Sequence, residues 1–283
     1  MANYDDLLNG NQQTPPQGFD KEAWAAGKKQ EREGLYTLAD QTALRAVASP
    51  EAFKQYLDMQ ARFDRYSATN ALLVMAQRPD AKQLGDLDYW KSQRVFIKRD
   101  ELPNAVIILA PGSEYTRNDG SIGTNMTTKR VYDISQAERV RVQPVRTYDE
   151  GKLIRALVKA APAQMEGVDA LGGRDAVYDP AQNKIFVQCG MSALEIMQAV
   201  ARESCVAQLG ENAGFEARVG TQLICAKFGI DSGMAFSDVR ESFDGLEAKE
   251  VREVLSNARN AAAEITGRMT KELEPKPKQQ GAR

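Results

Sequence analysis

The spacing of apolar residues changes from helical to extended near residue 95, and this change limits the folds open to the chain. Apolar residues recur at helical spacing over residues 50–65 and 66–77. The β-branched runs at 95–97 and 105–110 instead predict strands, the second of them buried on both faces. The first half therefore combines helices with a sheet.

Capping residues fix where these helices begin. Ser49 is an N-cap residue followed by Pro50 at the first helical position, and Ser67 is the cap expected for the next helix. Residues 86–93 predict one or two helical turns that carry Tyr89 and Trp90. Further on, we expect a loop or hairpin excursion and then a strand, over residues 112–128 and 129–134 respectively.

The second half is mainly helical, with a small sheet in front. Ser192 and Glu195 form a capping box that opens a helix to about Leu209, with an apolar face made of Leu194, Met197, Val200 and Ala201. A hairpin is predicted over residues 176–187. Helices are predicted at about 149–161, 214–228 and 246–273.

These patterns predict an α+β protein divided near residue 148 into a mixed helix and sheet domain and a mainly helical domain. The two ends are polar and offer little apolar surface to offset the entropy of ordering. We therefore expect a flexible tail at 1–34, domains at 35–148 and 149–273, and a second tail at 274–283.

The 283 residues include no histidine, which excludes histidine-based catalytic triads and histidine metal sites. No phosphate-binding glycine motif appears either, so no cofactor and no metal are expected. The beginning of the sequence lacks the basic and apolar pattern of a signal peptide, and no run is long and apolar enough to span a membrane. Three unpaired cysteines, expected as small core residues, fit a reduced cytoplasm.

The charge is unevenly distributed, although the net charge is only −2. Residues 61–99 contain eight Lys or Arg and four Asp, so this segment is +4 and the remainder is −6. Amides and aromatic residues are interspersed with these cations. Single-stranded nucleic acid is bound by such a set, with cations on phosphates, rings under bases and amides on base edges. The candidate binding residues are Arg65, Tyr66, Asn70, Gln77, Arg78, Trp90, Lys91, Arg94, Lys98 and Arg99.

Two alternatives stay open on the residues alone. On composition alone, the tyrosine and tryptophan are more typical of an ordinary core beneath a charged, solvated face. Glu203 and Glu216, on consecutive predicted helices, are either surface carboxylates or a pair able to act in acid–base chemistry or to hold a cation.

The first half resembles the ArdC-type antirestriction domain, which binds single-stranded DNA. The matching residues run from Arg65 to Ala81, followed by Tyr89-Trp90-Lys91 and a strand that ends at Pro111. Residues 99–104 depart from the basic, glycine-containing turn of that family. The resemblance implies a DNA-binding protein of a mobile genetic element.

The second half, from Val177 to the last helix, resembles an ImmA/IrrE-type zinc-peptidase domain. The resemblance places Arg202 and Val206 where the family has the two histidines of its HExxH helix, and keeps the catalytic glutamate as Glu203 and the third ligand as Glu216. An arginine has no lone pair to donate to zinc, so the resemblance implies an inactive peptidase and not an enzyme. An ion pair of Arg202 or Arg218 with one of these glutamates is expected to replace the metal.

The resulting hypothesis is a cytoplasmic protein that binds single-stranded DNA, with an antirestriction role and vestigial Glu203 and Glu216. The alternative is a protein-interaction module whose former peptidase cleft holds a host-defence or element-encoded protein. A cleft without basic residues would favour that alternative. A third hypothesis is an enzyme that uses Glu203 together with a lysine or a tyrosine.

Overall fold

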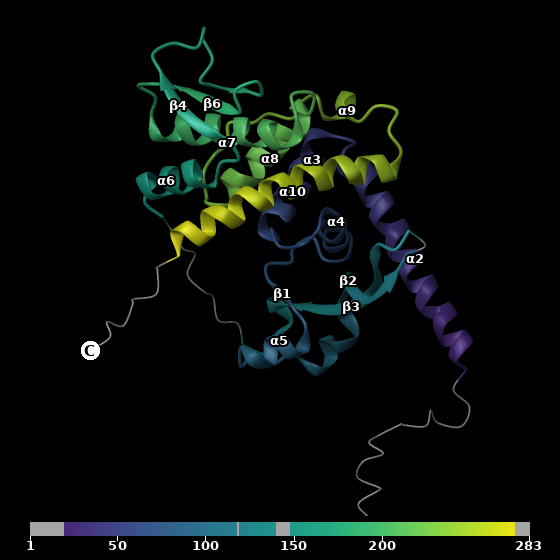
Figure 1. Cartoon of the computed structure of the whole chain (residues 1–283). Helices are drawn as coiled ribbons and strands as arrows, with labels where there is room; N and C mark the ends of the chain where they lie inside the picture. Colours follow the sequence, from purple (N-terminus) through teal and green to yellow (C-terminus); the bar gives the residue numbers. More distant parts are fainter. Residues whose placement is uncertain (1–19, 118, 140–147, 275–283) are drawn as a thin grey trace, which may run out of the picture.

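The computed structural model describes residues 20–117, 119–139 and 148–274, and its fold is α+β (Figure 1). The first half contains α2 (Lys21–Ala46), α3 (Pro50–Arg62), α4 (Ala68–Gln77), β1 (Leu84–Gly85), α5 (Leu87–Ser92), η1 (Arg99–Asn104), β2 (Val106–Thr116), β3 (Ile122–Asp133) and η2 (Ile134–Gln136). The second half contains α6 (Glu150–Ala160), β4 (Gln164–Val168), β5 (Ala176–Asp179), β6 (Lys184–Gln188), α7 (Ala193–Leu209), α8 (Gly214–Lys227), α9 (Val239–Ser242) and α10 (Ala248–Leu273).

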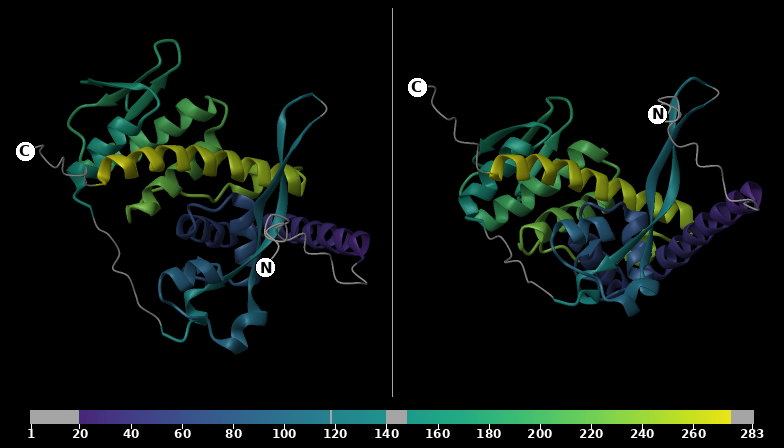
Figure 2. Two further views of the ribbon diagram at one scale, coloured as in Figure 1. Left: turned by 60° about the horizontal axis from the view of Figure 1, so that its bottom comes forward. Right: turned by 90° about the horizontal axis from the view of Figure 1, so that it is seen from below.

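Two small sheets lie on opposite sides of the long helix α10 (Figure 1). The first is antiparallel with strand order β1-β3-β2. In the second, of order β4-β6-β5, β6 pairs parallel with β4 and antiparallel with β5. Figure 2 shows the distal end of the β2–β3 hairpin projecting beyond the helices. None of the helices in the described ranges is long and apolar enough to cross a membrane.

The largest core joins residues from both sides of the predicted boundary at 148. Phe53 and Leu72 from the first half are fully buried in one cluster with Leu157, Ile224 and Leu255 from the second. Helix α10 packs on α2 and α4 as well as on α6, α7 and α8. The division into domains at 35–148 and 149–273 stays a prediction.

The predicted helix starts are confirmed at their caps. The Ser49 side chain accepts from Ala52 N at 3.2 Å, and Ser67 accepts from Asn70 N at 3.2 Å. Ser192 and Glu195 form the predicted capping box of α7. The hairpin over residues 176–187 is also confirmed, as β5 and β6.

Four predictions are wrong in part. Residues 21–34, assigned to a tail, are the first half of α2, whose alanines, lysines and glutamates favour a helix even where it is exposed. The segment 95–97 is no strand and has a single bridge from Ile97 to Ala137. Leu194, placed on the buried face of α7, is 48% exposed. Cys189 is exposed, whereas the other two cysteines are buried.

Candidate functional site

The exposed cations cluster in the segment Lys91–Arg99, which we call the cationic segment. It begins in the last turn of α5, and Arg94, the residue after the C-cap Gln93, adopts the left-handed conformation with φ of 57°. Arg94 N donates to Lys91 O at 3.0 Å and Val95 N donates to Trp90 O at 2.9 Å, the two bonds of a Schellman motif. Glycine usually takes this left-handed position, since a side chain there is strained.

The chain leaves this cap extended and presents alternate residues to opposite sides. Val95 and Ile97 pack against the cluster around Trp90, while Phe96 and Lys98 are exposed. Glu138 N donates to Phe96 O at 2.9 Å, and Lys98 N donates to Gln136 O at 3.0 Å. These bonds hold the backbone, so the outward side chains stand on a fixed support.

The cations of the cationic segment form no ion pair within the described ranges, although the charge of Lys98 acts on the nearby Glu101 carboxylate. The nine residues of the segment contain no carboxylate. None of the ion pairs formed by residues 20–117, 119–139 and 148–274 includes any of its four cations. All four cations are exposed, and they are Lys91, Arg94, Lys98 and Arg99.

Arg78 differs from these cations, because it is tied into the fold. Its guanidinium donates to Ser135 Oγ at 3.1 Å and lies 3.8 Å from the Glu101 carboxylate. Hydrogen bonds from Gln136 and Asn104, together with the positive charges of Arg78 and Lys98, hold the pKa of Glu101 below its ordinary value. Arg78 is therefore neutralised in part by its neighbour.

Asn70 and Gln77, predicted to read base edges, instead bind the edge of strand β2, and this corrects the prediction. Asn70 Nδ2 donates to Leu109 O at 2.8 Å, and its Oδ1 accepts from Leu109 N at 2.9 Å. Gln77 makes the same pair of bonds to Ile107, both at 2.9 Å. Because β2 is an edge strand, these amides satisfy its backbone as another strand would.

Trp90, predicted to stack on a base, is 2% exposed and lies in the core, which is a second correction. Its Nε1 donates to Tyr132 O at 2.9 Å. Tyr66 is half-buried and stacks on Phe63, and burial raises the pKa of its hydroxyl. Arg65 is exposed in the turn before α4.

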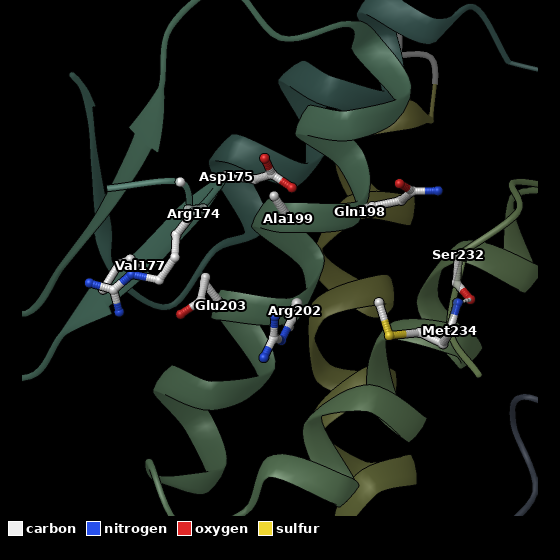
Figure 3. A pocket seen from close by; sticks show the side chains of 12 residues that line it. Arg174, Asp175, Val177, Gln198, Ala199, Arg202, Glu203, Ser232 and Met234 are labelled. Atoms are coloured by element: carbon white, nitrogen blue, oxygen red, sulfur yellow. Dashed lines mark hydrogen bonds between the residues drawn. The ribbon is translucent and has the colours of Figure 1, made fainter. Parts of the chain in front are cut away.

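The second candidate site is a polar cleft of about 400 Å³ between α7, β5 and the loop before α9. Its charged lining residues are Arg174, Asp175, Arg202 and Glu203 (Figure 3). Glu203 Oε2 accepts from Tyr178 N at 2.8 Å, on the strand edge of β5 that β6 leaves free. The cleft therefore carries equal numbers of positive and negative side chains.

The sequence predicted that Arg202 or Arg218 pairs with one of the two glutamates, Glu203 or Glu216. This prediction is wrong. Arg218 pairs with Asp238, which lowers the pKa of that carboxyl, and Glu203 accepts a backbone N–H instead. Glu216 is half-buried in the first turn of α8 and does not line the cleft.

The donor set near Glu203 does not fit a zinc or manganese ion. In residues 20–117, 119–139 and 148–274, no three His, Cys, Asp or Glu side chains lie close enough together to hold one. The guanidinium of Arg202 remains protonated and offers no lone pair to a metal.

Phe96 is a site residue that the sequence prediction missed. It is 62% exposed between two cations of the cationic segment. The available signal was the alternation Arg-Val-Phe-Ile-Lys, in which the two β-branched residues face the core and the other three face solvent.

No family model and no curated protein matches the sequence. The fold is similar to the Mn(II)-bound structure of the antirestriction ArdC protein from the R388 plasmid, with a TM-score of 0.55 and 14% identity. That likeness covers 85% of this chain and 99% of that one. The metal-free structure of the same protein gives a TM-score of 0.46 at 14% identity, over 72% and 84% of the two chains.

Proposed function

We propose that this protein binds single-stranded DNA through the cationic segment, in an antirestriction role on a mobile element. The observation that carries the proposal is the four exposed cations Lys91–Arg99, with no carboxylate among them. A strand of phosphates gains most from such a cluster, because each neutralised phosphate releases counterions. The similarity of the fold to that of an antirestriction protein from a plasmid supports the proposed antirestriction role on a mobile element.

The cluster differs from a solvated face of mixed charge, in which nearby carboxylates cancel the field of each cation. Elsewhere in the first half, Lys129 pairs with Asp86 at 2.5 Å and Arg78 lies near Glu101. Since no cation of the cationic segment forms an ion pair in the described ranges, a polyanion meets positive charges that the following Asp100 and Glu101 compensate only in part.

We propose further that the chain does not act as a zinc peptidase. The sequence has no histidine, and Arg202 stands next to Glu203 in the cleft. Mn(II) is bound in the structure of the ArdC protein, but the donors that surround Glu203 do not fit a metal in this chain. Glu203 here has a different task, which is to accept the N–H of Tyr178.

A protein-interaction role for the cleft is not favoured. From the sequence, we expected a cleft without basic residues if the cleft binds a protein partner. Arg174 and Arg202 both line the cleft, so this expectation is not met. We therefore propose one function for the chain.

Fluorescence anisotropy of a labelled oligothymidine tests the proposal. We expect Arg94→Gln/Lys98→Gln to weaken binding at low salt by roughly tenfold or more. The slope of log K against log salt should fall by about 1.4, since each phosphate contact to a single strand contributes about 0.7. Circular dichroism would verify that the variant is folded.

The cleft provides a matched control. Arg174→Gln/Arg202→Gln also removes two exposed cations without ion pairs in the described part of the chain, so general charge loss is the same. We expect this variant to bind as the wild type does. Absence of binding by the wild type at low salt, or an equal loss in both variants, would reject the cationic segment as the site.

A further inference from the structure

We infer that Phe96 is a stacking platform for one unstacked base and makes the cationic segment select single-stranded over duplex DNA. This inference rests on the proposed function. Phe96 is 62% exposed, more than any other exposed aromatic ring in the described part of the chain. An exposed ring has apolar surface whose removal from water is favourable, and the π-face of any base can cover it.

The ring has no partner inside the described molecule. Its neighbours Val95 and Ile97 join the cluster around Trp90, whereas Phe96 belongs to none of the hydrophobic clusters. It takes part in none of the ring contacts among residues 20–117, 119–139 and 148–274. Packing of the fold therefore does not require an aromatic residue at this position.

The backbone on both sides of the ring is fixed. Glu138 N donates to Phe96 O, Ile97 bridges Ala137, and Lys98 N donates to Gln136 O. A ring on such a support loses little backbone entropy when a base covers it, which is the advantage of a preorganised site.

Cations flank the ring in the sequence on both sides. The chain is extended from Val95 to Lys98, so Phe96 and Lys98 lie on one side about 6.6 Å apart, whereas Arg94 precedes this run at the left-handed cap position. The resulting row of cation, ring and cation matches a single strand whose phosphates contact the cations while a base lies on the ring. In a duplex each base is stacked and paired, so its face is not free.

The cations on either side of Phe96 favour a nucleotide over an apolar protein segment as the ligand of the ring. An apolar protein partner would gain nothing from two flanking cations without carboxylate neighbours in the segment, whereas a nucleotide carries both a ring and a phosphate. The exposed Tyr115 and Ile122 at the end of the β2–β3 hairpin have no comparable row, since Glu114 and Asp119 lie beside them.

The test compares Phe96→Leu with Phe96→Trp on an oligothymidine and on a duplex, with the full chain. Stacking contributes about 1–3 kcal/mol per base, so Phe96→Leu should weaken binding to the single strand by roughly 5- to 150-fold. Duplex binding and the salt slope should not change, because the four cations remain. Phe96→Trp should retain the preference, and its added indole fluorescence should be quenched by the single strand.

The outcomes separate this inference from the proposed function. Salt-dependent binding of the single strand by the wild type, with Phe96→Leu unaffected, would overturn the stacking role and leave the charge-based site intact. An equal loss of single-strand and duplex binding in Phe96→Leu would also overturn it. No binding by the wild type at low salt would reject the proposed function itself.

Discussion

The cationic segment and the cleft beside Glu203 both expose arginines, but their charges are arranged in opposite ways. The segment has four cations and no carboxylate, whereas Arg174 and Arg202 share the cleft with Asp175 and Glu203. In the balanced cleft the fields of opposite charges largely cancel, while a one-sign cluster attracts phosphates within the screening length of about 8–10 Å in physiological salt. The local arrangement of charge therefore separates the two sites, although the net charge of the chain is slightly negative.

The cationic segment is supported from behind by a buried tryptophan. Removing this ring is the substitution for which we predict the largest effect. Trp90 lies behind the cationic segment, fully packed and hydrogen-bonded to Tyr132 O. Trp90→Ala should lower the free energy of unfolding by about 3–5 kcal/mol, as expected for a buried tryptophan. Chemical denaturation measures this value, with Phe96→Leu as an exposed control that should change it by less than about 0.5 kcal/mol. A loss below about 1 kcal/mol for Trp90→Ala would mean that the ring is not packed as described.

The next effect is a dependence on pH at Asp133, a buried carboxylate on the side of the cationic segment. The Asp133 carboxylate is 1% exposed and accepts from Lys82 N, Gln83 N and Ser135 N at 2.7–2.9 Å. Burial raises its pKa, but these hydrogen bonds outweigh burial and hold the pKa below the ordinary value of 3.8. Asp133→Asn should cost about 2 kcal/mol of stability at neutral pH, because a buried donor loses its acceptor.

The sign of this pH dependence follows from the lowered pKa. The unfolded chain takes up the proton at a higher pH than the folded chain, so the stabilisation is complete above about pH 4. It is lost as the pH falls from there through the folded pKa. Thermal unfolding at about pH 7 and about pH 3 should therefore show a smaller difference between wild type and Asp133→Asn at the lower pH. A difference that grows on acidification would contradict this assignment.

Local signals made the helices and the second hairpin predictable. A cap such as Ser49, Ser67 or Ser192 lies within three residues of the N–H groups that it binds, so the sequence contains the whole interaction. The tail was misjudged because the first half of α2 is exposed. Its helicity depends on the intrinsic helix propensity of its residues, whereas the tail was predicted from the low apolar content of the segment.

The candidate site was harder to predict, because its residues depend on partners far along the chain. Asn70, Gln77 and Trp90 bind backbone groups 30–42 residues away. In the sequence, an amide beside cations is equally suited to bind the edge of a base or the edge of a strand. The partner that it binds lies far along the chain, so the local sequence does not show which of the two it is. The exposed cations Lys91, Arg94, Lys98 and Arg99 were found because charged side chains seldom have a place in a core.

In the cleft, a smaller effect tests whether Glu203 has a structural task. Glu203→Ala leaves Tyr178 N–H without its acceptor and should lower stability by about 1 kcal/mol, whereas Glu203→Gln keeps an acceptor oxygen and should lose less. Neither variant should change affinity for single-stranded DNA. Denaturation and anisotropy measured on both variants would show this separation. A DNA-binding defect in Glu203→Gln would place the cleft in the DNA site and remove the distinction between the two regions.

The smallest predicted effect has opposite signs for stability and for binding. Arg94 occupies the left-handed position of a Schellman motif, where a residue with a side chain costs about 1–2 kcal/mol relative to the right-handed region. Glycine removes this strain but adds entropy to the unfolded chain, worth about 0.5–1 kcal/mol. Arg94→Gly should therefore stabilise the fold by about 0.5–1 kcal/mol.

The same substitution removes a cation that flanks Phe96, so single-strand affinity should fall several-fold while the protein becomes more stable. Asn183, the other non-glycine residue with positive φ in the described ranges, provides the comparison. Asparagine tolerates this conformation, and its Oδ1 accepts from the Tyr178 hydroxyl at 3.1 Å, so Asn183→Gly should not stabilise the fold and should leave DNA affinity unaltered. Denaturation and anisotropy on both variants measure the two quantities separately. Backbone strain is expected to persist at a residue when its replacement stabilises the fold but harms binding, as at a functional position. A loss of stability in Arg94→Gly would contradict this interpretation of Arg94.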